Sequence, residues 1–386
     1  TTLTELGILR SLHMAVTPLD SLSDDAKTLD MTLSASFDAP MNADLEVDFS
    51  SKSNSFIGPR LIFGVRHKNF FKGGEVFSVK LNAAYEWQTG NSSEQANSTS
   101  VNSYEFGLNT SLSYPRLIVP RFIKQPVKYP ARTTLSLGAN LLNRPSFFRM
   151  VSASVSGAYD WQSSATSYHN LQVFKLTYNH LISTTPRFDT LMLNNPAIAM
   201  SFENQLIPSS SYTYTWDKPI GRARRNRITW QSTVTSAGNL FSGIDALFGG
   251  KRPRKVFGNQ YSQFVKGQTE LKYLYRINDR LTLATRLSMG IGYAYGNSTV
   301  MPYSEQFYIG GANSIRAYTI RSIGPGSFRP DPEKTYGYFD QTGDIKLEAN
   351  AELRIGIFGG LSGAVFIDAG NIWLLEDDPQ RPGGYI

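Results

Sequence analysis

The sequence contains no cysteine, and this absence excludes a disulfide framework, a cysteine-ligated metal and a thiol nucleophile within the chain. Histidine is also scarce: there are 4, and no two of them stand at the i, i+4 spacing that places two metal ligands on one helix face. No run of about 18 apolar residues occurs, so no membrane-spanning helix is predicted. We therefore expect no metal site, no cofactor and no transmembrane helix.

Charged residues make up only 18% of the chain, yet the formal net charge is +7. The basic excess is concentrated in 221–227 (GRARRNR) and 251–255 (KRPRK), and neither stretch has the interleaved aromatic residues of a nucleic-acid site, so no nucleic-acid partner is expected. The excess indicates either a mildly basic surface or contact with anionic lipid headgroups. The candidate headgroup contacts, worth roughly 1 kcal/mol each, are Arg222, Arg224, Arg225 and Arg227.

A period-two alternation of apolar and polar residues dominates the rest of the chain. In 80–87 (KLNAAYEW) the odd positions are apolar and the even positions are mostly polar. This pattern is typical of a β-sheet with one apolar and one wet face. It recurs at 104–114, 134–141, 151–161, 271–277, 281–295, 347–355 and 361–369.

Two architectures fit such a sheet: a soluble sandwich or barrel with apolar residues inside, and a transmembrane barrel with apolar residues outside. Three features favour the membrane. The segments often exceed the length of about 5–6 residues common in soluble proteins, their polar faces suit a water-filled lumen, and short and long connections alternate. The sequence therefore predicts an all-β fold, a transmembrane antiparallel β-barrel over residues 37–386.

The same pattern gives about 13 strands between Ala43 and Trp373. Bacterial single-chain barrels have an even number of strands, so we expect further closing strands to be missing from this sequence. The first strand, near 43–50, is expected to be short. Two short loop helices are predicted, within 186–205 and 239–248. In residues 1–36, helical apolar spacing at 3–12 and two possible strands resemble the tail of a small α/β domain.

One segment, 308–326 (YIGGANSIRAYTIRSIGPG), interrupts the alternation inside the longest connection, 296–343. Its glycines do not follow the G-x-x-x-x-G-K-[ST] phosphate-binding pattern. It is either an extracellular loop with glycine turns or a loop that folds into the barrel. In the second case Arg316 would need a carboxylate, because an unpaired buried charge is costly. Glu348, Glu352 and Asp368, on the polar faces of the two strands that follow, are the candidates.

The stretch GGANSIRAY (310–318) resembles the inward-folding loop motif of the BamA/TamA superfamily of outer-membrane assembly proteins, usually [V/I]-R-G-[F/Y]. NAELR (350–354) and FIDAGNIW (366–373) resemble the two strands that follow the motif in that superfamily, and RHKNFFKGGE (66–75) resembles an early turn. IRAYTIRSIGPG (315–326) is most similar to the TamL-type proteins of Bacteroidetes.

The resemblance implies a 16-stranded barrel, preceded by periplasmic POTRA domains of which residues 1–36 would be the tail. It implies an inward-folding loop over 296–343, with a tip motif of Ile315, Arg316, Ala317 and Tyr318. It also implies contact of Arg316 with Glu352 and Asp368. Alanine replaces the family's glycine at 317, and because alanine disfavours positive φ, we expect the backbone of the tip to differ.

The resemblance further implies a place in the outer membrane of a Gram-negative bacterium. The function would be assembly or insertion: folding and inserting, or translocating, β-barrel or surface proteins through a weak barrel seam. The partners would be nascent outer-membrane proteins, outer-membrane lipids or lipopolysaccharide, and an accessory or periplasm-spanning subunit. The alternative is a passive pore or a channel of the two-partner-secretion type. No G-x-S-x-G motif occurs, so an enzyme is not expected and no catalytic residue is assigned.

Overall fold

The computed structural model describes most of the 386 residues. These are residues 9–18, 29–51, 56–88, 102–119, 129–145, 147–194, 202, 204–221, 225–247, 255–256, 259–329, 341–379 and 381–386. No helix among them is long and apolar enough to cross a membrane.

The described elements are mostly long strands. In chain order they are β1 (Leu9–Pro18), β2 (Leu29–Phe37), β3 (Met41–Ser51), β4 (Phe56–Lys68), β5 (Val76–Gln88), β6 (Asn102–Tyr114), β7 (Ala131–Arg144), β8 (Phe148–Ser164), β9 (Ser167–Thr184), α2 (Pro186–Asn194), β10 (Gln205–Ile220), β11 (Asn226–Ala237), α4 (Asn239–Leu247), β12 (Lys255–Val256), β13 (Asn259–Gln260), β14 (Phe264–Arg276), β15 (Leu281–Ala294), β16 (Ile345–Phe358) and β17 (Leu361–Trp373).

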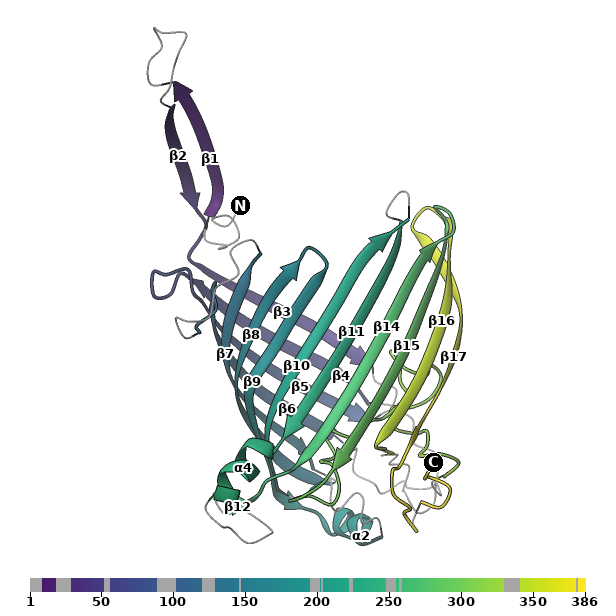
Figure 1. The fold of residues 1–386 in the computed structure, drawn as a ribbon. Helices are drawn as coiled ribbons and strands as arrows, with labels where there is room; N and C mark the ends of the chain where they lie inside the picture. The colour runs from purple at the N-terminus through teal and green to yellow at the C-terminus, as the bar shows by residue number, and fades with distance from the viewer. Residues whose placement is uncertain are drawn as a thin grey trace.

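Thirteen of these strands form one antiparallel sheet in the order β17-β16-β15-β14-β11-β10-β9-β8-β7-β6-β5-β4-β3. Each strand therefore pairs with its neighbour along the chain, once the small β12–β13 hairpin is set aside. The sheet curls round, so that β3–β6 pass behind β11–β15 (Figure 1). Among the described residues, β3 and β17 are the two edges of the sheet and are not hydrogen-bonded to each other.

Apolar side chains cover the outer face of the sheet. Val47 and Ile367 are 71% and 72% exposed, and large apolar residues at alternate positions of most other strands are exposed too. Polar residues on the opposite face, among them Glu86, Ser103 and Glu348, are buried. A sheet with an apolar outer face and a polar inner face is a transmembrane barrel. The prediction of that architecture, and of about 13 strands, is confirmed.

Short and long connections lie at opposite ends of the barrel. The short turns 165–166, 277–280 and 359–360 lie at one end, where the β1–β2 hairpin also projects, whereas α2, α4 and the C-terminus lie at the other (Figure 1). Three connections depart from the expected pattern. Residues 52–55 between β3 and β4 and residues 145–147 between β7 and β8 are short connections at the end with the long loops, whereas 115–130, between β6 and β7, is a long connection at the short-turn end. Because outer-membrane barrels have short periplasmic turns, we refer to the short-turn end as periplasmic.

The compact hydrophobic clusters lie among the long loops. Phe188 of α2 packs on Phe147, Phe148 and Phe202. A second cluster joins Ile207, Ala237, Phe264 and Met301 at the ends of β10, β11 and β14. Both predicted loop helices are present, as α2 and α4. The long-loop end of the barrel therefore contains hydrophobic clusters formed by the loops and the adjoining strand ends.

Two expectations about the N-terminal region are wrong. Residues 9–12 belong to strand β1 and not to a helix, because β1 pairs with β2 in register from Ser11–Ser36 to Pro18–Leu29, and this pairing outweighs a short apolar spacing. Strand β3 is not short: it has 11 residues, all paired with β4. Residues 1–8 and the polar link expected at 21–27 lie outside the described part of the chain.

Candidate functional site: the arginine loop on the lumen wall

The loop between β15 and β16 is fastened at its base before it reaches the lumen wall. Phe307 and Gly343 exchange two backbone hydrogen bonds of 2.9 Å, which extend the β15–β16 hairpin by one bridge. Beyond this bridge, Ile309 and Ile315 of the loop pack with Phe307 and with Ile372 of β17 in one buried cluster. Apolar packing therefore positions the tip beside the last two strands.

The tip itself is a tight turn that returns the chain on itself. The amide of Gly311 donates to the carbonyl of Tyr318 at 2.8 Å. Gly310 has φ 102°, and a Cβ there would lie 2.3 Å from the carbonyl oxygen of Thr319, so only glycine fits. Ala317 has φ 68°, the left-handed conformation that glycine usually supplies. The expectation that the tip backbone differs is wrong at this residue, which takes the glycine-like conformation at an energetic cost.

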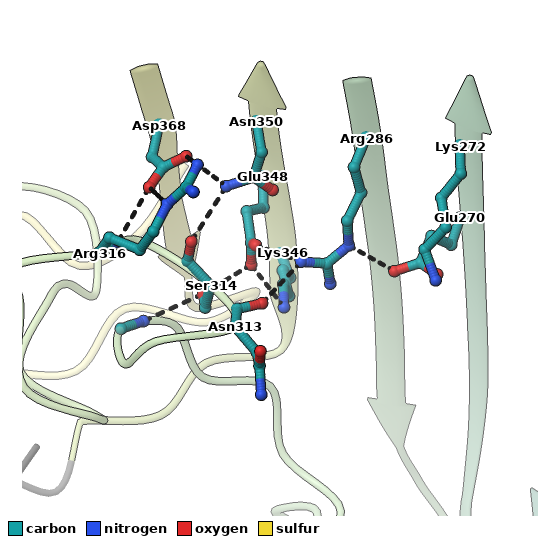
Figure 2. A network of polar contacts seen from close by, with 11 residues as sticks. Glu270, Lys272, Arg286, Asn313, Ser314, Arg316, Lys346, Glu348, Asn350 and Asp368 are labelled. Atoms are coloured by element: carbon teal, nitrogen blue, oxygen red, sulfur yellow. Dashed lines mark hydrogen bonds and ion pairs between the residues drawn. The ribbon is translucent and has the colours of Figure 1, made fainter. Parts of the chain in front are cut away.

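Arg316 lies between two carboxylates of the lumen wall. Its Nε and one terminal nitrogen donate to the two oxygens of Asp368 at 2.8 and 2.7 Å (Figure 2). Its other terminal nitrogen donates to Glu352 at 2.5 Å. The backbone amide of Arg316 also donates to Asp368, at 3.0 Å. A bidentate guanidinium–carboxylate pair is strong and fixes orientation. The structure thus brings together the three residues that the sequence singled out.

Two further contacts hold this arginine clamp, formed by Arg316, Glu352 and Asp368. The guanidinium carbon of Arg316 lies 3.6 Å from the centre of the Phe366 ring, a cation–π contact. Asn350 donates to Asp368 at 2.9 Å and to the carbonyl of Ser314 at 3.0 Å, so it joins the wall to the loop backbone. Hydrogen bonds from the guanidinium to Asp368, and then to Glu352, raise the pKa of Arg316 above its ordinary value. The clamp is therefore a permanently charged contact.

A second network continues from the tip across β16, β15 and β14. Glu348 is fully buried, accepts hydrogen bonds from Ser314 and Arg286 at 2.8 and 2.9 Å, and pairs with Lys346 at 2.8 Å. Arg286 also donates to the carbonyl of Asn313, at 2.8 Å, and to Glu270 at 2.5 Å (Figure 2). Charge pairing satisfies the buried carboxylate. The loop tip is thus joined to β15, β16 and β17.

Sequence reasoning did not identify most of this second network. Glu348 was a candidate partner of Arg316, but it binds Ser314 and Arg286 instead. Arg286, Glu270 and Ser314 were not singled out. The usable signal was strand register: once β14–β17 are aligned, Lys272, Arg286, Asn350 and Asp368 form one row across the lumen face. Four strands must be aligned correctly before that row can be read.

The candidate headgroup arginines are only partly described. Arg222 and Arg224 lie outside the described residues. Arg225 lies 3.6 Å from Asp279, with both side chains largely exposed, and Arg227 forms a two-point contact with Asp217. Arg227 also lines a lumenal cavity under the loop tip, together with Arg316. Two of the four residues therefore already have carboxylate partners.

A barrel with an apolar outer face, a polar lumen and an arginine loop fastened to the inner wall belongs to the class of outer-membrane β-barrels. The chain matches the Omp85 superfamily domain over residues 31–383, and it is a member of that family. Its place is the outer membrane of a Gram-negative bacterium.

Sequence similarity beyond the family match is partial. Over 120 residues the chain is 30% identical to the outer membrane protein assembly factor BamA of Neisseria meningitidis serogroup B. That match spans 30% of this chain and 14% of the relative.

Solved structures share the fold at low identity. BamA from Haemophilus ducreyi lacking POTRA domains 1–3 matches with a TM-score of 0.62 and 13% identity, over 97% of this chain and 64% of that chain. CdiB from Escherichia coli matches with a TM-score of 0.50 and 14% identity, over 96% of this chain and 58% of that chain. The chain thus spans less than two thirds of the length of these structures.

Proposed function

We propose that the chain is the barrel region of an outer-membrane assembly factor that promotes folding and insertion, or translocation, of β-barrel or surface proteins. The observation that supports this most is the position of the arginine clamp, because it fixes the loop tip to β16 and β17, the strands at one edge of the sheet. Membership of the Omp85 superfamily and the partial identity to a BamA agree with it. The chemistry required is strand pairing, so no catalytic residue is proposed.

The proposed mechanism depends on the backbone groups at a weak seam. An edge strand presents unpaired N–H and C=O groups, and an incoming strand can pair with them by β-augmentation. In this chain the candidate edges are β3 and β17. A loop held on β16 and β17 would keep the edge strand β17 straight and aligned while a substrate strand pairs. Loss of the clamp should therefore slow assembly more than it reduces the amount of barrel.

Further parts of the proposal concern partners. We propose that residues 1–36, of which the β1–β2 hairpin is described, are the tail of a POTRA-like domain, since the hairpin projects from the periplasmic end (Figure 1). Nascent outer-membrane proteins would be the substrates, with a periplasm-spanning or accessory subunit as a partner. Outer-membrane lipids or lipopolysaccharide would contact the outer wall, and the arginines of 221–227 would contact headgroups. We also propose that the protein is of the TamL type, because residues 315–326 are similar to the loop of the TamL-type proteins.

A second candidate function is a secretion channel of the two-partner type, or a passive pore. The fold similarity to CdiB from Escherichia coli and Acinetobacter baumannii, each with a TM-score of 0.50, favours it. Planar-bilayer recording separates the two functions. A large and steady conductance that is unchanged when the clamp is broken would favour the pore, whereas a small conductance with active substrate insertion would favour the assembly factor.

The direct test is charge reversal in the clamp, with the full chain in liposomes and a small outer-membrane protein as substrate. Arg316→Glu should slow substrate folding, measured by the gel shift of the folded barrel. Because Asp368 accepts three of the four hydrogen bonds from Arg316, rescue should come from Arg316→Glu with Asp368→Arg. Arg316→Glu with Glu352→Arg should rescue less, since the introduced glutamate would still face Asp368. Normal substrate folding by Arg316→Glu alone would contradict the proposal.

A further inference from the structure

A cavity of about 390 Å³ lies under the loop tip, inside the barrel. Its roof is the tip segment 312–316, and its floor is two adjacent rows of lumen residues. One row runs through Arg227, Leu274, Ala284 and Glu352, and the next runs through Thr229, Lys272, Arg286 and Asn350. Ala284 is the smallest of these side chains, and it leaves room between its neighbours. The volume is at the low end of ligand pockets.

The lining of this cavity is strongly cationic. It includes five basic side chains but a single carboxylate, that of Glu352. Arg316 and Arg286 are largely buried in the networks described above, with 22% and 26% of their side chains exposed. The other three keep more than half of their side chains exposed: Arg227 at 60%, Lys272 at 56% and Arg354 at 57%.

Two of these exposed cations pair with a carboxylate that a largely buried arginine already binds. Glu352 accepts from Arg316 at 2.5 Å and also from Nε of Arg354 at 2.7 Å. Glu270 accepts from Arg286 at 2.5 Å and also pairs with Lys272 at 2.5 Å. Neither carboxylate needs its second cation to avoid an unpaired buried charge.

Arg354 also has donors to spare. Its contacts among the described residues use Nε alone, which leaves the two terminal nitrogens for another acceptor. Because Glu352 and Glu270 are each held by a largely buried arginine, Arg354 and Lys272 are the two cations that an anion in the cavity can engage, whereas Arg227 is already paired with Asp217. A cleft lined by one sign of charge, with low-dielectric walls, concentrates ions of the opposite sign.

We propose that this cavity binds a carboxylate of a polypeptide segment, either an aspartate or glutamate side chain or a C-terminus, with Arg354 and Lys272 as the binding residues. The guanidinium fork matches a planar carboxylate. Arg354 and Arg227 lie near the ends of β16 and β11 that join the short turns, so the cavity faces chains that arrive from the periplasm. The choice of polypeptide rests on the proposed function.

The test uses the absence of cysteine, since Ala284→Cys places a unique thiol on the cavity floor of the full chain. The rates of modification by anionic sulfonatoethyl and cationic trimethylammonioethyl methanethiosulfonate are compared. A control thiol, Gly360→Cys, lies in the short turn after β16, where an added Cβ meets nothing within 4 Å. The anionic reagent should be favoured at Ala284→Cys by about tenfold relative to the control.

Adding Arg354→Gln and Lys272→Gln should abolish this preference without unfolding the barrel, because Glu352 and Glu270 keep their buried arginines. Arg225→Gln removes an equally exposed arginine outside the cavity and should leave the preference unchanged. A hexapeptide with two glutamates and a free C-terminus should protect the thiol, whereas its glutamine, C-terminally amidated analogue should not.

Two results would overturn the inference. Equal rates for both reagents, or a preference that survives the double substitution, would mean that there is no anion site. Equal protection by the two peptides, or protection by inorganic phosphate at the concentration at which the acidic peptide protects, would mean that the occupant is not a polypeptide carboxylate. None of these measurements uses substrate folding, so a chain that binds the peptide yet fails to promote assembly would contradict the proposed function alone.

Discussion

Removal of the Asp368 carboxylate tests the arginine clamp most sharply. Asp368 accepts three hydrogen bonds from Arg316, of 2.7, 2.8 and 3.0 Å, and one of 2.9 Å from Asn350, and its side chain is only 4% exposed. In Asp368→Ala the guanidinium keeps Glu352 and the face of Phe366, so the arginine is not left unpaired.

The expected cost of this substitution falls below that of a fully broken buried pair, which is about 3–5 kcal/mol. Hydrogen bonds to charged groups contribute about 1.5–3 kcal/mol, and one of the two carboxylates remains. We therefore expect the free energy of opening the loop tip to fall by about 2–3 kcal/mol, which is roughly a 30- to 140-fold change in the opening equilibrium.

Hydrogen exchange measured by mass spectrometry follows this equilibrium, because the amide of Arg316 is bonded to Asp368 in the seated tip and the amide of Gly311 is bonded to Tyr318 in the folded tip. Peptides covering 307–326 should exchange faster in Asp368→Ala by about that factor. Asp279→Ala, which removes the carboxylate of an exposed pair with Arg225, is the matched control and should change exchange in this segment by less than threefold. If the two variants exchange alike in 307–326, the clamp does not hold the tip.

Three other substitutions have defined outcomes. Ala317→Gly should stabilise the tip by about 1 kcal/mol because it relieves a left-handed alanine, and faster exchange at Gly311 would contradict this. Phe366→Leu should lower the tip stability by about 1 kcal/mol through loss of the cation–π contact, and an unchanged exchange rate would count against that contact. Burial raises the pKa of Asp344, at the end of the loop, above its usual 3.8. The folded state therefore binds this proton more tightly than the unfolded state does. Its stability falls as the pH rises from 3.8 through the raised pKa. Asp344→Asn should therefore raise the unfolding temperature, measured by gel shift, at pH 7 and not at pH 3.5, and an equal effect at both would contradict the reasoning.

The strands could be predicted from the sequence because period-two alternation is a local signal. The same alternation predicted two of the partners of Arg316, because it places Glu352 and Asp368 on the polar faces of adjacent strands. The network from Glu348 to Glu270 could not be predicted in this way. It depends on the register of β14, β15 and β16, and a one-residue error in any pairing turns the side chains to the other face.

Two failures have a different origin, since long-range contacts override a local preference. Leu9–Leu12 have an apolar spacing that suits a helix, but nine residues of β2 are available to pair with the chain that continues from them. Ala317 disfavours φ above zero, but the residues on either side are fixed, Arg316 by the clamp and Tyr318 by its hydrogen bond with Gly311. Neither constraint can be read from the stretch of sequence that it distorts.

The seating of Arg316 also makes the loop a check on how the last two strands are aligned. Asp368 pairs directly with Asn350, and Glu352 pairs with Phe366, so all four residues meet the loop tip in one alignment only. A slip of β17 by two residues would preserve the alternation of its side chains but move Asp368 by about 7 Å, beyond the reach of both the guanidinium and Asn350. A two-residue slip therefore leaves the apolar face unchanged but breaks the ion pairs of Arg316. In a misaligned barrel the arginine loop could not seat on the lumen wall.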